Sequence, residues 1–304
     1  MQTTTGFRTL IADNTEWMKI IEKQSDFSML GDLHERLAFE RLLSRSVPQG
    51  GAKTMIGYCE VCGAATEFVM DWQHSDNVAV NFRERLGCRQ CQFNSRMRFM
   101  LGLLKKLFKV CPVHDVYMYE MVTPFFRACR HLFPTVNWVG SEYLGATHTS
   151  GQLINGIRHE DALNLSFGSK THDLLISCDV YEHVPDVLRA LKEACRVLRD
   201  GGTLLFSVPM NLGSKDSTQR AVVQNGRIVH LLPEAYHGNP LSAQGSLVFT
   251  DFGWDLLEMC KAAGFHRAYM IAYYSVFYGY LGCGLQYVLV AESKEEAEKQ
   301  TSSR

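Results

Sequence analysis

THDLLISCDVYEHVPDVLRALKEACRVLRDGGTLLFSVP, residues Thr171–Pro209, is the stretch that decides the fold. Residues 173–177 form a short apolar run with polar neighbours, which is typical of a buried strand in a parallel sheet. Residues 185–198 repeat apolar side chains at helical spacing, and an Asp-Gly-Gly turn separates them from a second apolar run at 203–208. This strand–helix–strand unit predicts a parallel sheet with right-handed crossovers. Such sheets bind ligands beyond the carboxyl ends of their strands, here at residues 178–183.

The block also carries a recognisable succession of short motifs: Asp173–Ser177, Glu182–Asp186, Arg196–Gly202 and Pro209. Together they resemble the central motifs of class I S-adenosylmethionine-dependent methyltransferases, with a likeness that extends from about Val113 to Glu292. The resemblance implies an α/β fold with a doubly wound, mostly parallel, Rossmann-like sheet of seven strands. An arbitrary strand–helix–strand unit with a surface Glu-His pair is the alternative.

Length and composition describe a globular chain. It has 304 residues, 46% of them hydrophobic, and a formal net charge of −1, which allows one large domain and a small one. Because no apolar run reaches 18 residues and the N-terminus lacks a signal-peptide core, we expect a cytoplasmic protein without a membrane partner. The sequence leaves the oligomeric state open, a homodimer included.

The chain divides into segments of different character. Residues 1–50 are expected to be helical, with Asn14 capping a helix that carries Trp17, Ile20 and Ile21. The remaining predicted segments are a zinc-ribbon module with a basic helix (51–110), the methyltransferase domain (111–292), which contains an insertion (211–246), and a charged tail (293–304).

Two Cys-x2-Cys pairs stand in the second segment, at Cys59, Cys62, Cys88 and Cys91. Two intervening residues let both thiolates of a tight turn face one ion, and four thiolates favour zinc in a closed structural site. A redox dithiol and an iron–sulfur cluster are the alternatives.

A basic run begins within the same module. It contains Arg83, Arg85, Arg89, Arg96, Arg98, Lys105, Lys106 and Lys109 against the single acid Glu84. Such a patch can contact RNA phosphates, or its cations can face water on an ordinary amphipathic helix. The sequence does not separate these two interpretations.

The resemblance assigns cofactor-binding roles at successive strand ends. It implies that Glu120, after the first strand, and Glu142, beside Tyr143 after the second, contact the cofactor, with Glu142 accepting the ribose hydroxyls. It also implies that Asp161 accepts from the adenine amino group with Ala162 against the ring, and we add Asp179 after the fourth strand.

The loop after Glu120 departs from the family pattern. It reads Glu120-Met-Val-Thr-Pro-Phe-Phe-Arg127 and lacks the three spaced glycines that let the backbone approach the cofactor. This difference leaves open a degenerate domain that binds the cofactor or serves as a scaffold without catalysis. The helix expected after Thr123-Pro124 still offers free amides to a carboxylate.

His183 is the expected catalytic residue, because an imidazole can take a proton from a hydroxyl near neutral pH. Asp179, Glu182 and His183 also resemble the divalent-metal site of the ubiquinone-pathway O-methyltransferases, which adds Mg²⁺ as a second hypothesis. The block lacks the Asn/Asp-Pro-Pro-Tyr sequence of amino-group methylases.

The insertion is too long and polar for a simple connection, and long loops inside compact domains are commonly functional. Within it, Tyr236, His237 and Asn239 are the candidate substrate contacts. We therefore expect O-methylation of a small hydroxylated metabolite, such as a sugar or natural-product intermediate. RNA, suggested by the cysteine pairs and the basic run, is the second candidate acceptor.

Overall fold

The computed structural model describes residues 7–12, 18–75, 78–282 and 284–294, so the predicted cap Asn14 and Trp17 lie outside the described residues. The chain forms two compact units. The first contains the N-terminal part up to Ile21, Ser25–Pro112 and Met270–Tyr287. The second contains Glu22–Gln24, Val113–Tyr269 and the part from Val288 onward.

The largest sheet has seven strands in the order β1-β17-β18-β10-β9-β5-β6. The strands are β1 (Met18–Ile21), β5 (Asp115–Met118), β6 (Asn137–Gly140), β9 (His172–Cys178), β10 (Leu198–Ser207), β17 (Arg267–Tyr273) and β18 (Gln286–Glu292). The pairs β6–β5, β5–β9 and β9–β10 are parallel, whereas β18 runs antiparallel to β10 and β1 antiparallel to β17. This mixed sheet with helical crossovers confirms the predicted Rossmann-like fold.

The central block folds as the sequence predicts. Helix α7 (Val187–Val197) joins β9 to β10, and its N-cap is Asp186, whose Oδ1 accepts a hydrogen bond from the Arg189 amide. The apolar stripe of α7 is buried, which stabilises the crossover against the sheet. Strand β10 begins directly after the helix, and its register shifts between Leu198 and Thr203, where Gly201 has a positive φ of 75°.

The edges of the sheet differ from expectation. The expected third strand near residue 157 is reduced to a short hairpin of β7 (Leu153–Ile154) and β8 (Ile157–Arg158), followed by one isolated parallel bridge between Glu142 and His159. The seventh strand is instead β1, in a stretch that we predicted to be helical. Met18 and Ile21 are both buried there, a spacing that fits a helix as readily as an irregular edge strand.

In the described residues, the first unit holds four whole helices and a small sheet. Its helices of ten residues or more are α3 (Leu33–Arg45) and α5 (Ser95–Val110), and its shorter ones are α1 (Phe7–Ala12) and α4 (Phe82–Arg85). Helix α2 (Gln24–Ser28) begins in the second unit and ends in the first. Strands β2 (Ala52–Cys59), β3 (Ala64–Asp71) and β4 (Gly87–Cys88) form an antiparallel sheet, and two of the four paired cysteines, Cys59 and Cys88, end its strands β2 and β4.

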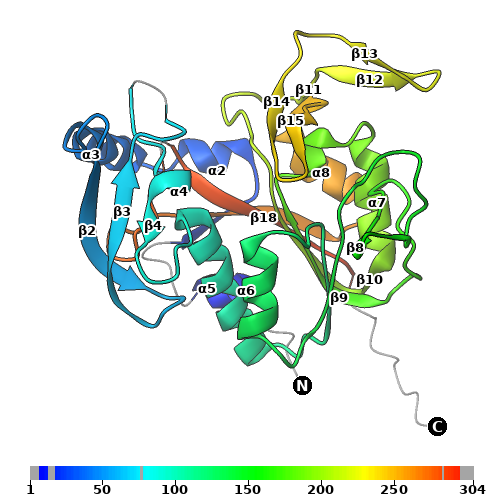
Figure 1. The fold of residues 1–304 in the computed structure, drawn as a ribbon, viewed down its shortest axis with the longest axis horizontal. Coiled ribbons are helices and arrows are strands. Elements are labelled where there is room, and N and C mark those ends of the chain that lie inside the picture. The colour runs from blue at the N-terminus through cyan, green and yellow to red at the C-terminus, as the bar shows by residue number, and fades with distance from the viewer. Residues whose placement is uncertain (1–6, 13–17, 76–77, 283, 295–304) are drawn as a thin grey trace. The chain divides into compact units, whose positions relative to one another are not determined.

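The second unit adds α6 (Pro124–Leu132), α8 (Asp255–Ala262) and a folded insertion. The insertion contains two hairpins, drawn in yellow in Figure 1: β12 (Ala221–Gln224) with β13 (Arg227–His230), and β14 (Tyr236–Asn239) with β15 (Ser242–Leu247). Strand β11 (Thr218–Gln219) pairs with β16 (Thr250–Asp251), which ties the insertion at both ends. Within the described parts of the chain, no helix has the length and apolar character needed to cross a membrane.

Candidate functional site

The carboxyl end of β9 carries an unusual backbone conformation. Asp179 follows the strand with a positive φ of 53°, which a non-glycine residue adopts only when its surroundings hold it there. Its amide donates to the Ser207 carbonyl, and the Ser207 hydroxyl donates to its Oδ1 at 2.8 Å. The chain then turns into the 3-10 helix η1 (Tyr181–His183), so this bend presents Glu182 and His183 beyond the strand.

Glu182, His183 and His237 form one cluster. Their candidate ligand atoms all lie within 4.8 Å of one another. Glu182 Oε1 is 3.7 Å from His183 Nε2 and 3.4 Å from His237 Nδ1, and the two imidazole rings meet edge to face at 5.1 Å. The Glu182 side chain is buried, and its carboxylate raises the pKa of His237 because it stabilises the imidazolium form. The insertion thus contributes one of the three groups of this cluster.

The hydrogen bond of His183 sets its tautomer. Its Nδ1 lies 2.8 Å from the Leu247 carbonyl oxygen, which can only accept, so Nδ1 carries the hydrogen. In the neutral ring, Nε2 therefore presents a lone pair on the side of Glu182 and His237. Leu247 ends β15, and nearby the Phe249 amide donates to the Glu182 carbonyl at 2.7 Å. These two bonds connect the insertion to η1.

The other predicted substrate contacts do not join this cluster. The Tyr236 hydroxyl donates to Glu234 Oε2 at 2.8 Å, and Asn239 Nδ2 donates to Ser246 Oγ at 2.9 Å. Both bonds stay within the insertion. Of the three candidates there, only His237 is brought to Glu182 and His183.

Glu142 supports the loop that lacks glycines. Its Oε1 accepts hydrogen bonds from the amides of Met121 and Val122 at 2.8 and 3.0 Å. The next residue, Thr123, caps α6 by accepting from the Phe126 amide, with Pro124 at the first helical position. A carboxylate and a capped helix therefore hold the loop after Glu120 without glycines.

The predicted adenine-binding residues lie in a tight turn. Asp161 Oδ1 accepts from the Leu163 amide at 2.9 Å, and Ala162 is buried. Tyr143 is 57% exposed, and its ring lies 5.5 Å from that of His159. Partial desolvation of the hydroxyl and the nearby Asp161 carboxylate raise the pKa of Tyr143.

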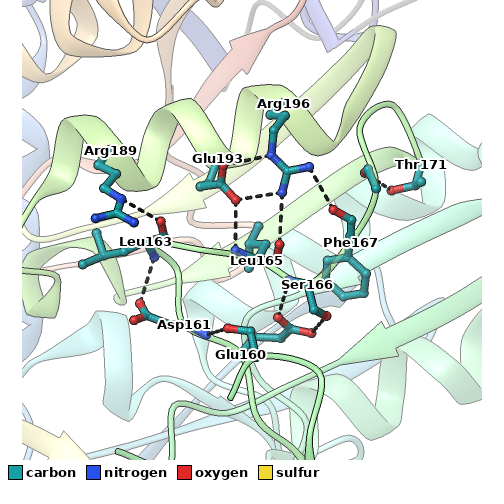
Figure 2. Close-up of polar contacts among 12 residues, drawn as sticks. Glu160, Asp161, Leu163, Leu165, Ser166, Phe167, Thr171, Arg189, Glu193 and Arg196 are labelled. Atoms are coloured by element: carbon teal, nitrogen blue, oxygen red, sulfur yellow. Dashed lines mark hydrogen bonds and ion pairs between the residues drawn. The ribbon is translucent and has the colours of Figure 1, made fainter. Parts of the chain in front are cut away.

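Side chains of α7 bond to residues 163–167, where the sequence led us to expect the end of a third strand. Figure 2 shows Arg189, Glu193 and Arg196 bonded to the backbone that follows Asp161. The bonds are Arg189 Nε to Leu163 O (2.9 Å), the Leu165 amide to Glu193 Oε2 (2.9 Å), and Arg196 to Leu165 O (3.1 Å) and Phe167 O (2.9 Å). Arg196 and Glu193 also pair with each other at 2.7 Å. The sequence did not predict that Glu193 and Arg196 bond to this backbone, because Arg196 was noted only as part of a family motif.

The four paired cysteines converge in the first unit. Their sulfur atoms all lie within 4.8 Å of one another, with Cys59–Cys91 and Cys62–Cys88 both at 3.8 Å. Each pair forms the same turn: the Gly63 amide donates to the Cys59 carbonyl and the Gln92 amide to the Cys88 carbonyl. Gly63 and Gln92 both have positive φ values, of 69° and 62°. Two matching knuckles thus face each other across one tetrad of thiols.

The basic run is largely neutralised. Arg85 pairs with Asp71, Arg89 with Glu67, Arg83 and Arg96 with Glu84, and Lys106 with Glu60. Arg98 is fully buried and donates to the carbonyls of Leu86, Tyr278 and Gly279. The expectation that Arg98 belongs to a surface patch is therefore wrong, because its guanidinium serves the backbone of the first unit.

Comparison with known proteins identifies the domain. Residues 105–206 match the family model described as a methyltransferase domain. A search of curated proteins found no match to this chain.

Solved structures of methyltransferases resemble the chain at low identity. An S-adenosylmethionine-dependent methyltransferase from Methanosarcina mazei is 13% identical over 63% of this chain and 98% of its own, with a TM-score of 0.38. One from Mesorhizobium loti is 16% identical over 62% and 96%, with a TM-score of 0.38. The 1,6-didemethyltoxoflavin-N1-methyltransferase of Burkholderia thailandensis is 14% identical over 66% and 78%, with a TM-score of 0.39. Scores this low carry no argument. The match of residues 105–206 to a methyltransferase domain, together with the seven-stranded sheet, supports an S-adenosylmethionine-dependent methyltransferase.

Proposed function

We propose that this methyltransferase acts on an oxygen of a small hydroxylated metabolite, such as a sugar or natural-product intermediate. The observation that carries the proposal is the cluster of Glu182, His183 and His237, which unites the end of β9 with the insertion. A buried carboxylate and an oriented imidazole suit the activation of a hydroxyl group. His183 is the residue that would contact and activate the acceptor oxygen.

Methyl transfer from a sulfonium is an in-line displacement, so the enzyme mainly holds the two reactants together and assists loss of the acceptor proton. We propose that Glu142 and Asp161 bind the ribose and adenine of S-adenosylmethionine, with Glu120, Tyr143, Ala162 and Asp179 nearby. The two amides held by Glu142 support this proposal. They give the loop a defined shape despite its missing glycines.

A small acceptor is favoured over RNA because most cations of the basic run are buried or paired with acids. Nucleic-acid affinity depends on cations that can neutralise phosphates. Here Arg98 is buried and the neighbouring arginines pair with acids of the same unit. RNA remains the second candidate, suggested by the cysteine tetrad on a small sheet.

We also propose one zinc ion at Cys59, Cys62, Cys88 and Cys91, in a structural role. Support comes from the paired knuckles and from sulfur separations of 3.8 Å, which approach those of thiolates bound to one tetrahedral ion at about 2.3 Å. An ion there would join β2 to the segment that follows β4.

Transfer of a labelled methyl group tests the acceptor class. The enzyme is incubated with methyl-labelled S-adenosylmethionine and with separated metabolite and RNA fractions of a cell extract. We expect label in the metabolite fraction, lost in His183→Ala and kept in His230→Ala, a histidine of β13 outside the cluster. His183→Ala should retain cofactor affinity, because no predicted cofactor contact changes. Label in RNA would overturn the proposal, and absence of label from both fractions would favour a degenerate domain.

A further inference from the structure

The Glu182 carboxylate is buried and makes only long contacts with two imidazoles. The residue is 1% exposed, and neither carboxylate oxygen accepts a hydrogen bond from the residues that the structure describes. A buried ionised carboxylate is unfavourable unless a cation or several donors compensate it. The nearest nitrogen atoms are His237 Nδ1 and His183 Nε2, at 3.4 and 3.7 Å from Oε1. The contact with His237 lacks the geometry of a hydrogen bond, and the contact with His183 is too long for one.

The two imidazoles meet the requirements of metal ligands. The Leu247 carbonyl fixes the hydrogen of His183 on Nδ1, which leaves the Nε2 lone pair directed to the cluster side. This arrangement, one ring nitrogen bonded to a backbone carbonyl and the other available, is the usual outer support of a metal-bound histidine. The rings of His183 and His237 are nearly perpendicular, at 85°, with their centroids 5.1 Å apart.

From these contacts we propose that Glu182, His183 and His237 bind a divalent first-row transition ion. Metal–ligand bonds of about 2.0–2.2 Å place neighbouring ligand atoms roughly 3–3.5 Å apart. The separations from Glu182 Oε1 are 3.4 and 3.7 Å, and all three ligand atoms lie within 4.8 Å of one another, so side-chain rotations that draw them closer would bring them to one ion. Two nitrogen ligands and one carboxylate suit zinc, iron or cobalt better than magnesium, which prefers an all-oxygen octahedron.

The site differs from the expected magnesium site in one ligand. Asp179, predicted there, accepts the Ser207 hydroxyl and is not among the three converging donors. His237 replaces it, contributed by β14 of the insertion. Folding of the insertion would therefore be needed to complete the site.

Three protein ligands leave positions open on the ion, as catalytic rather than structural sites do. An acceptor hydroxyl oxygen fits such a position, and this part of the inference rests on the proposed function. A hydroxyl bound there would ionise more readily and lose its proton to solvent water, and His183 would act as a ligand of the ion in place of the direct contact with the acceptor proposed above.

Cobalt tests the site without any acceptor. Co²⁺ is added to the full chain after its cysteines have been loaded with zinc, and its visible spectrum is recorded. We expect a spectrum of nitrogen and oxygen ligation in the wild type and in His230→Ala. Affinity for Co²⁺ should fall by at least about 10-fold in Glu182→Gln and His237→Ala. A sulfur-to-cobalt band would instead report exchange at the cysteines.

Melting temperatures measured with and without Co²⁺ distinguish loss of the metal site from misfolding of a variant. Glu182→Gln removes a buried charge, so without metal it should melt at or above the wild-type temperature, while only the wild type and His230→Ala gain stability from Co²⁺. Equal Co²⁺ affinity of wild type and Glu182→Gln, or no uptake beyond the cysteines, would overturn the inference. Because neither reading needs methyl transfer, the site and the proposed function fail separately.

Discussion

Replacement of Arg98 by methionine tests whether the basic run is structural. The side chain is fully buried, donates to three backbone carbonyls at 2.5, 2.7 and 3.2 Å, and lies 4.0 Å above the Phe68 ring. Hydrogen bonds to a charged donor contribute roughly 1.5–3 kcal/mol each, from which the cost of burying the guanidinium must be subtracted. We expect Arg98→Met to lower the free energy of unfolding by about 3–5 kcal/mol.

Arg89→Met is the matched control. Its side chain is 67% exposed and pairs with Glu67, so its loss should change the free energy of unfolding by about 0–1 kcal/mol. Urea unfolding followed by tryptophan fluorescence measures both, since Trp72 lies in the same unit and its indole is bonded to the Val47 carbonyl. A stable Arg98→Met protein that has lost RNA affinity would refute the structural role and return Arg98 to an open binding surface.

Three further perturbations have defined outcomes. Arg196→Met removes the hydrogen bonds to the carbonyls of Leu165 and Phe167, which hold the segment after the proposed adenine contact Asp161, so calorimetry should show S-adenosylmethionine binding weakened by about 1–3 kcal/mol. The control Arg227→Met, in the insertion, should bind like the wild type, and equal affinities of Arg196→Met and wild type would show that this segment needs no support from α7. Burial raises the pKa of Glu40 from 4.5 to about 8, so the folded state holds a proton that the unfolded state loses, and the free energy of unfolding should fall as pH rises from about 5 to 8. The urea midpoint should therefore fall less steeply with pH in Glu40→Gln than in the wild type, and a wild-type midpoint that rises relative to Glu40→Gln over this range would contradict the prediction. Elemental analysis should find about one zinc per chain when metal other than zinc is withheld, lost in Cys91→Ser and kept in Cys111→Ser; a folded wild type without zinc would exclude the ion.

The central block was predictable because its local signals agree. The buried run of β9, the capped amphipathic α7 and the turn at Gly201 each specify the same strand–helix–strand unit. The cysteine tetrad was predictable for a similar reason, since two-residue spacing restricts a turn to few geometries. His237 could be named from its place in a long insertion.

The edges and the bonding pattern could not be read in the same way. Residues 18–21 are too short for their periodicity to distinguish strand from helix, and their pairing with Met270–Tyr273 spans most of the chain. The segment in the place of the third strand is bonded to Arg196 and Glu193, whose partners lie about 30 residues away in the sequence. Arg98 looked like a surface cation because sequence alone does not reveal which carbonyls need a donor.

Calorimetric titration of S-adenosylmethionine into the wild type and Glu142→Ala tests the central claim most directly. Glu142 holds two loop amides and is the proposed acceptor for the ribose hydroxyls. The wild type should bind the cofactor, and Glu142→Ala should bind it about 1.5–3 kcal/mol more weakly, while Glu258→Ala on α8 should match the wild type. No binding by the folded wild type, or equal binding by Glu142→Ala, would contradict the proposed cofactor site.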